Sequence, residues 1–350
     1  MRAKRWLPWL TAGLAAVGLM VVAAGYAGSS HGKKAAPAAK KLKVGLVTDI
    51  GGLNDRGFNQ SAYQGLKRAI AKLGIQGKVL TSSSQADYIP NFTSLIRKKY
   101  DLVIGVGFLQ ETSIGTVAAK YPKTKFAGVD IPFADLKQKP KNFQGIVFKE
   151  QEVGCLVGDL AARVAAANIT PARAGASSTI GWVGGIPVPA VIRYGAGYTF
   201  CAKRAVPGTT VLKDFSQDFV AQDKCKELAL KHFNAGSSVE FQVAGGCGLG
   251  VLDAAKEQGK WGIGVDVDQR LTAPKNVLTS AEKKVDVGVY DTIRDAVKGK
   301  FKGGGDHVFA LKDGGVGLAP ISSKVPASIR AAEKKTEAAI LSGKLKPPTK

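Results

Sequence analysis

Acidic, aromatic and glycine residues follow several short apolar runs of this sequence. Asp49 comes after VGLVT, Asp130 after FAGV and Asp266 after WGIGV. Phe215 ends the run VLKDF, and Gly246 lies in GGCG after VEFQVA. Carboxylates accept hydrogen bonds from N–H and O–H donors, aromatic rings stack on planar groups, and glycines let backbone amides approach a ligand. This combination predicts the binding of a small polar molecule and implies no catalytic step.

Motifs of hydrolases and of zinc sites are missing from the 350 residues. The sequence has no G-x-S-x-G elbow, and His31, His232 and His307 have no serine or cysteine motif that points to them. The cysteine spacings contain no CxxC, and so few histidines offer a zinc ion little. We therefore expect neither an enzyme nor a cofactor or metal.

A dinucleotide-binding enzyme is the main competing enzyme interpretation. The strand VEFQVAGG leads through Gly246, Gly248 and Gly250 into a helix, and Asp266 follows on the next strand. The pattern G-x-G-x-x-G, begun at Gly246, requires a third glycine where Val251 stands. The spacing argues against a dinucleotide, although a glycine-rich turn before a helix can hold any ribose.

Short apolar runs alternate with helical patterns from Leu42 onward. In the first half, the expected strands are KVGLVTD, KVLTSS, DLVIGVG and KFAGVD, with helices over about 56–73, 89–99 and up to about 120. In the second half, a helix EQEVGCLVGDLAARVAAA precedes strands TIGWVGG, TVLKDF, VEFQVAGG and WGIGVD, with helices over about 189–204, 221–233 and up to about 257. Strands and helices that alternate in this way form parallel sheets.

Two successive sheets of one construction predict an α/β fold with two Rossmann-like lobes joined by a hinge. We expect the first lobe over 42–148 plus about 279–308, and the second over 149–270 plus about 309–345. Open parallel sheets bind ligands beyond the carboxyl ends of their strands, where the residues named at the outset lie. The lobes should therefore face each other across a ligand-binding cleft.

The N-terminal residues predict export. Residues 1–27 have a basic start, an apolar stretch and a small-residue ending, which is the layout of a secretory signal peptide. An uncleaved anchor is the alternative, because the apolar stretch could just span a bilayer. Residues 28–41 predict a flexible basic tether. A lipid anchor would need a cysteine at the cleavage point, and the first is Cys155. We expect the cell envelope, at the outer face of the cytoplasmic membrane or in the periplasm.

The formal charge of +23 raises the question of nucleic acid. Basic residues occur in ones and twos along most helices, without the aromatic interleaving of a single-strand binder or a DNA-reading motif. We expect no nucleic-acid partner, and instead a solvated basic surface that favours an anionic membrane or wall surface.

Export makes the four cysteines candidates for disulfides. Cys201 and Cys225 lie in neighbouring predicted helices and are the pair that we expect. Cys155 and Cys247 either form a second pair or remain small buried hydrophobic side chains.

Long motifs of the chain resemble the basic membrane protein family of type I periplasmic binding proteins, whose best-understood members bind purine nucleosides. In chain order they are DIGGLNDRGFNQSAYQGL, FKEQEVGCLVGDLAA, IGWVGGIPVPAVIRYGAGY, GGCGLGVLDAAKEQGKWGIGVDVDQ and VLTSAEKKVDVGVYDTIRDA. The resemblance implies the type I fold, closure of the two lobes on a ligand, and delivery of that ligand to the permease of an ABC importer.

The resemblance also implies how a purine base is held. Phe58 would be the aromatic side chain of the first lobe, and Phe215 the facing aromatic of the second. Asp49 and Asn59 would read the edge of the base. Stacking of this kind contributes on the order of 1–3 kcal/mol per base.

For the ribose, the resemblance implies Asp266 and Lys283, with Asp130 and Gly246 on the same wall. Vicinal hydroxyls suit an aspartate and a lysine, which together offer acceptors and donors. The chain departs from the family at Cys247, where a small polar residue is usual. A sugar or another small signalling ligand bound by the same fold remains the alternative.

Overall fold

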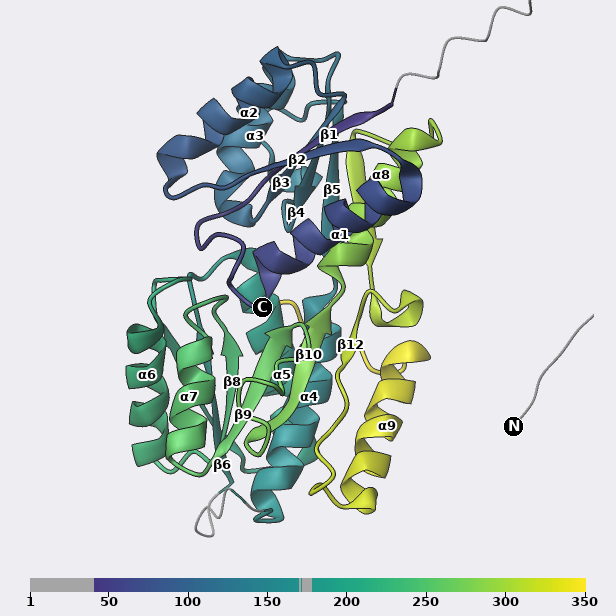
Figure 1. The fold of residues 1–350 in the computed structure, drawn as a ribbon. Coiled ribbons are helices and arrows are strands. Elements are labelled where there is room, and N and C mark those ends of the chain that lie inside the picture. Colours follow the sequence, from purple (N-terminus) through teal and green to yellow (C-terminus); the bar gives the residue numbers. More distant parts are fainter. Residues whose placement is uncertain (1–40, 170, 172–177) are drawn as a thin grey trace, which may run out of the picture. The chain divides into compact units, whose positions relative to one another are not determined.

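The computed structural model describes residues 41–169, 171 and 178–350 (Figure 1). Residues 41–350 form one compact unit that holds all the elements below. The predictions for the signal segment and for the tether up to residue 40 lie outside the described residues. Within the part described, no helix is both long enough and apolar enough to cross a membrane.

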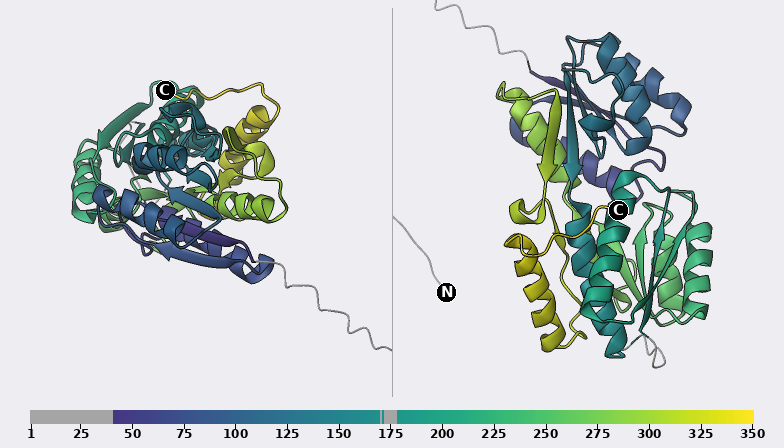
Figure 2. Two further views of the ribbon diagram at one scale, coloured as in Figure 1. Left: turned by 90° about the horizontal axis from the view of Figure 1, so that it is seen from above. Right: turned by 180° about the vertical axis from the view of Figure 1, so that it is seen from behind.

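The first lobe is a parallel sheet covered by helices on both faces. Its strands lie in the order β11-β5-β4-β3-β1-β2. They are β1 (Lys43–Val47), β2 (Gln76–Leu80), β3 (Leu102–Val106), β4 (Lys125–Val129), β5 (Phe143–Phe148) and β11 (Gly305–Phe309). Helices α1 (Phe58–Leu73) and α8 (Val285–Val297) cover one face, and α2 (Tyr88–Arg97) and α3 (Glu111–Lys120) cover the other (Figures 1 and 2).

The second lobe repeats this construction with the strand order β12-β10-β9-β8-β6-β7. The strands are β6 (Thr179–Gly184), β7 (Thr210–Phe215), β8 (Val239–Val243), β9 (Trp261–Asp266), β10 (Val277–Lys283) and the short antiparallel β12 (Val316–Leu318). Helices α6 (Gln222–Asn234) and α7 (Leu249–Glu257) lie on one face, opposite α4 (Glu150–Ala166) and α5 (Pro189–Ala205). The last helix, α9 (Ala327–Leu341), packs on α4.

Within the described residues three chain crossings connect the lobes, and one of the predicted lobe boundaries is wrong. The chain passes from β5 to α4, from β10 to α8 and from β11 to β12. We expected the return to the first lobe from about residue 279, but β10 belongs to the second sheet up to Lys283, because it pairs in parallel with β9. At the hinge, the Lys149 N–H donates to the Phe309 carbonyl and the Lys284 N–H to the Gly315 carbonyl, both at 2.9 Å.

The predicted disulfide between Cys201 and Cys225 is also wrong. The structure has Cys155–Cys201 and Cys225–Cys247. Helix α5, which carries Cys201, packs tightly on α4: a methyl group at Gly158 would lie 2.1 Å from the Tyr198 carbonyl oxygen. Cys225 lies on α6, on the other face of the sheet. Helices α5 and α6 follow each other in the chain but lie on opposite faces of the sheet, so each disulfide joins cysteines on one face.

Candidate ligand-binding site

The carboxyl ends of both sheets enclose a cavity with about 700 Å³ of space, part of which is open to solvent. The two lobes contribute about equally to its lining. Seven of the eight residues predicted from the sequence lie there: Asp49, Phe58, Asn59, Asp130, Gly246, Asp266 and Lys283. Phe215 does not.

Asp49 is a buried carboxylate with one oxygen already bonded. Its Oδ1 accepts hydrogen bonds from the Tyr88 hydroxyl and, at 2.8 Å, from the Ile50 N–H. Burial raises the pKa of Asp49 to about 6, against the opposing effect of these two donors. Gly107 makes room for the other oxygen, because a Cβ at this residue would lie 2.1 Å from Asp49 Oδ2. Residue 107 also has a φ of 105°, which favours glycine.

Asn59 holds the loop that carries Asp49. Its Oδ1 accepts from the Asp49 N–H at 3.2 Å, and its Nδ2 donates to the Ile50 carbonyl at 3.3 Å. The side-chain amide expected to read a base edge therefore also bonds to backbone groups of its own lobe.

Asp55 also lines the cavity, although it is not among the site residues predicted from the sequence. Its carboxylate accepts from the N–H groups of Gly57, Asn59 and Gln60 at 3.2, 2.7 and 3.0 Å. Burial raises its pKa although these three donors act in the opposite direction. These hydrogen bonds hold the Asp55 carboxylate at the N-terminal end of α1, three residues before Phe58, and it also lies on the cavity wall.

Lys283 lies among carboxylates at the point where β10 leaves the second lobe. Its Nζ is 2.6 Å from Asp130 Oδ2, 3.6 Å from Glu150 Oε1 and 3.8 Å from Asp266 Oδ1, and the residue is only 2% exposed. Burial alone would lower the pKa of Lys283, but Asp130, Asp266 and Glu150 raise it well above its ordinary value. The lysine is therefore charged, and its contact with Asp130 joins the two lobes.

Asp130 and Asp266 occupy equivalent positions in the two sheets, at the ends of β4 and β9. Both adopt left-handed backbone conformations, with φ of 59° and 65°. Such residues cost on the order of 1–3 kcal/mol and cluster at ligand clamps. Asp130 Oδ1 is buried without a hydrogen-bond partner among the described residues. An unpartnered acceptor on the cavity wall is available to a donor from a ligand.

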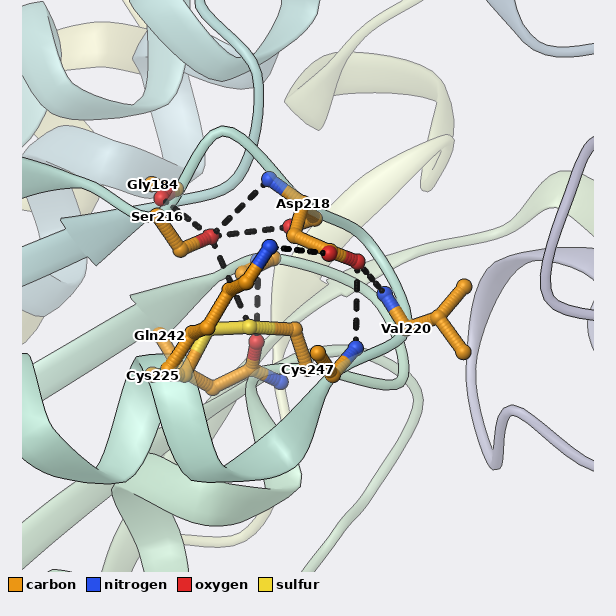
Figure 3. The surroundings of a disulfide bond; sticks show 10 residues. Gly184, Ser216, Asp218, Val220, Cys225, Gln242 and Cys247 are labelled. Carbon is orange, nitrogen blue, oxygen red and sulfur yellow. Dashed lines mark hydrogen bonds and ion pairs between the residues drawn. A yellow bond between two sulfur atoms is a disulfide. The ribbon is translucent and has the colours of Figure 1, made fainter.

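Phe219, in the loop after β7, lines the cavity, whereas Phe215, the last residue of β7, does not. Phe215 points into the sheet packing, where its ring meets Trp182 edge-on at 5.3 Å between centroids. The turn after it reverses the chain: Ser216 Oγ donates to the Asp218 carbonyl, and Asp218 Oδ1 accepts from the Val220 N–H (Figure 3). The sequence signal was the second phenylalanine of DFSQDF.

The Cys225–Cys247 disulfide fixes the glycine loop beside Phe219 (Figure 3). The Cys247 N–H donates to the Phe219 carbonyl at 3.1 Å, and its Sγ lies 3.4 Å from Ser216 Oγ. Gly246, which precedes the cysteine, lines the cavity. Cys247, which stands where the family usually has a small polar residue, therefore joins this loop to α6 and holds the turn at Phe219.

The cavity is acidic within a basic protein. Its charged lining consists of four aspartates and one lysine among the described residues. The apolar part comprises Phe58, Phe108 and Phe219, the ring of Tyr194 and several aliphatic side chains. No group of three or more histidines, cysteines or carboxylates in the described ranges could hold a metal ion. The arrangement suits a flat, neutral or cationic molecule with several hydrogen-bond donors.

Two α/β lobes, three crossings and a cavity between the carboxyl ends of the strands define a type I periplasmic solute-binding protein. A crystal structure of an ABC transporter solute-binding protein from Aeropyrum pernix K1 is similar, with a TM-score of 0.79, 26% identity, and coverage of 88% of this chain and 94% of that one.

Within this class the chain belongs to the basic membrane protein family. The family model described as "ABC transporter substrate-binding protein PnrA-like" matches residues 41–346. A CD4+ T-cell-stimulating antigen of Listeria monocytogenes is 33% identical over 89% of each chain. The ABC transporter nucleoside-binding protein BmpA of Lactococcus lactis is also 33% identical, over 88% of this chain and 90% of its own length. Relatives in this family are solute-binding proteins rather than enzymes.

The carboxyl group of Asp266 should make stability depend on pH. Burial raises its pKa to about 7 in the folded state, against 3.8 for an ordinary aspartate. Between about pH 4 and 7 the folded chain holds a proton that the unfolded chain has lost, so the free energy of unfolding falls as the pH rises through this window. The substitution Asp266→Asn removes this titration, and asparagine tolerates the left-handed backbone at this position.

The stability of Asp266→Asn relative to wild type should therefore be higher at pH 8 than at pH 5, by about 3 kcal/mol. Urea denaturation of both proteins at the two pH values measures this difference. An equal difference at pH 5 and pH 8 would show that the carboxyl group titrates alike in the folded and unfolded chains.

Proposed function

We propose that this chain captures a nucleoside, with a purine as the base, and delivers it to the permease of an ABC importer. The observation that carries the proposal is that Phe58 lines a cavity together with four aspartates, which can accept hydrogen bonds. The relative from Lactococcus lactis, whose name states nucleoside binding, supports the same ligand class.

The base would lie between aromatic rings of the two lobes. Phe58 comes from the start of α1, and Phe219 takes the place that was expected for Phe215. Asp49 follows β1 at the same end of the cavity, with Oδ2 not used by Tyr88 or Ile50. A carboxylate there can accept hydrogen bonds from the N–H groups of a purine edge.

The ribose would lie against Asp130, Asp266 and Lys283. Two aspartates offer acceptors to vicinal hydroxyl groups, and the ammonium group offers donors. Lys283 Nζ also lies 4.8 Å from the centroid of the Phe58 ring. The residues proposed for the ribose therefore adjoin the ring on which the base would stack. This distance is consistent with a ligand in which a flat base is joined directly to a hydroxylated ring.

The charge of the cavity argues against phosphorylated ligands. Four aspartates and one lysine line it, and a phosphate group would add negative charge to this surface. The carboxylate of an amino acid meets the same repulsion. We therefore propose a nucleoside and exclude a nucleotide.

Hinge closure would bury the ligand. The lobes are joined by three short crossings, and residues of both lobes contact any molecule in the cavity. Motion of this kind is typical of two-lobed binding proteins and gives a permease a closed form to recognise.

A thermal-shift panel tests the ligand class on the chain from Gly28 onward, which keeps the whole compact unit. A ligand that binds only the folded state raises Tm, by about 5 °C at a 100-fold excess over Kd. We expect this response to purine nucleosides and none to the matching nucleotides, free sugars or amino acids. A response to a sugar alone would contradict the nucleoside and favour the alternative ligand of this fold.

Single substitutions separate the stacking residues from the packing residue. Phe58→Ala and Phe219→Ala should weaken nucleoside binding about 5- to 100-fold, because each removes one stacked ring. Phe215→Ala is the matched control: it should lower Tm through loss of the Trp182 contact and leave Kd close to wild type. Calorimetric titration and thermal melts measure both quantities. A larger loss of affinity in the Phe215 variant would restore the original assignment.

We also propose that the protein works at an anionic membrane surface. The connections at the amino ends of the first sheet form a basic pole whose exposed lysines include Lys72, Lys98, Lys99, Lys120, Lys123, Lys141, Lys298, Lys300 and Lys302. The first strand, β1, begins beside this pole at Lys43. Surface lysines near anionic lipid contribute about 1 kcal/mol each.

Charge reversal tests this surface. The variant Lys298→Glu/Lys300→Glu/Lys302→Glu should lose most of its co-sedimentation with vesicles of phosphatidylglycerol and phosphatidylcholine, and binding should weaken as salt increases. The control Lys334→Glu/Lys335→Glu/Lys344→Glu has the same net charge but changes exposed lysines of the second lobe. Equal losses in the two variants would mean that net charge, rather than the basic pole, governs binding.

A further inference from the structure

Gln269 of the second lobe makes a hydrogen bond to the first lobe beside the cavity. It follows β9, is 3% exposed, and donates through Nε2 to the Arg56 carbonyl at 3.1 Å. Arg56 precedes α1 in the first lobe. Neither residue lines the cavity, so this contact between the lobes does not require a ligand.

The second lobe fixes the orientation of the Gln269 amide. Its Oε1 accepts from Gln242 Nε2 at 2.7 Å and from the Val265 N–H at 3.1 Å. Gln242 Oε1 in turn accepts from the Ala244 N–H at 3.1 Å. With the oxygen of Gln269 occupied by two donors, only its Nε2 can face Arg56. The amide chain thus runs from the strand before the glycine loop to the first lobe.

Two glycines provide the space for this amide chain. A Cβ at Gly248 would lie 1.7 Å from Gln242 Oε1, and a Cβ at Gly264 would lie 2.7 Å from Gln269 Oε1. The backbone N–H of Gln269 is also bonded, to Ser280 Oγ at 3.0 Å. A glutamine packed this tightly meets the other lobe as a rigid donor.

The acceptor in the first lobe lies at a strained residue. Arg56 has a φ of 51°, and non-glycine residues in this region persist where their surroundings hold them. Asp55 before it and Phe58 shortly after it both line the cavity. The lobes approach each other here: a Cβ added at Gly57 would lie 3.7 Å from Asp266 Oδ2, and one added at Gly246 would lie 3.9 Å from Asp55 Cβ.

We propose that Gln269 is a latch that stabilises the closed arrangement of the lobes and so sets ligand affinity without touching the ligand. Apparent affinity scales with the fraction of molecules in the binding-competent state, and a hydrogen bond present only in the closed state increases that fraction. The choice of a nucleoside rests on the proposed function, whereas the latch itself concerns the lobes alone.

Gln269→Glu tests the latch with little change in size. One carboxylate oxygen can still accept from Gln242 and Val265, but the other faces the Arg56 carbonyl without a proton to donate. Gln258→Glu, at an exposed glutamine after α7, is the control with the same change of charge. Gln269→Leu is a second variant that removes the donor without placing a charge in a buried position.

Fluorescence energy transfer between dyes on Ser83→Cys and Gln222→Cys, both exposed and on opposite lobes, reports the closed fraction in the chain from Gly28 onward. Without ligand, we expect a closed population in the unmodified background, a smaller one in both Gln269 variants and no change in Gln258→Glu. With the purine nucleoside that gives the largest Tm rise, Kd should increase on the order of tenfold, mainly through faster dissociation.

Folded Gln269 variants with an unchanged closed fraction would overturn the latch and leave Gln269 as a packing residue of the second lobe. The latch would also be overturned if the labelled protein with an unchanged Gln269 showed no closed population. If no nucleoside binds, the proposed function fails, but the comparison without ligand still decides the role of Gln269.

Discussion

The buried charge of Lys283 is the constraint on which the site depends. An ammonium group removed from water must be surrounded by carboxylates, and removing one partner of such a group costs about 3–5 kcal/mol. Asp130 comes from the first lobe, Asp266 from the second, and Glu150 from the start of α4 at the first crossing. Glu150 is held in addition by Arg193 at 2.6 Å. The lysine thus links both lobes and the hinge at the cavity wall.

The second lobe contains the rigid side of the cavity. Helices α4 and α5 pack closely enough to require glycines and are joined by Cys155–Cys201, while Cys225–Cys247 attaches the glycine loop to α6. Tyr194, on α5, therefore reaches the cavity from a fixed helix pair. A rigid wall lowers the entropy that a ligand must remove on binding.

Much of the fold and most of the site could be predicted, because parallel sheets place the ends of their strands together. Asp49, Asp130 and Asp266 follow apolar runs, and each lies at the cavity as expected. The return to the first lobe was misplaced because β10 ends in TSAEK, which reads as a polar connection although it pairs with β9 and is mostly buried. Gln269 gave no signal, because its acceptor is a backbone carbonyl more than 200 residues earlier in the chain.

The sequence by itself determined the two α/β lobes, the family resemblance and the residues at the strand ends, since these depend on local periodicity and on motifs. Only the tertiary structure decided which cysteines pair and that Phe219, rather than Phe215, lines the cavity. Both depend on the face of a sheet to which a side chain points: α5 and α6 lie on opposite faces, and Phe215 points into the packing beside Trp182. A one-dimensional pattern places a residue at the end of a strand, but the turn that follows sets its direction.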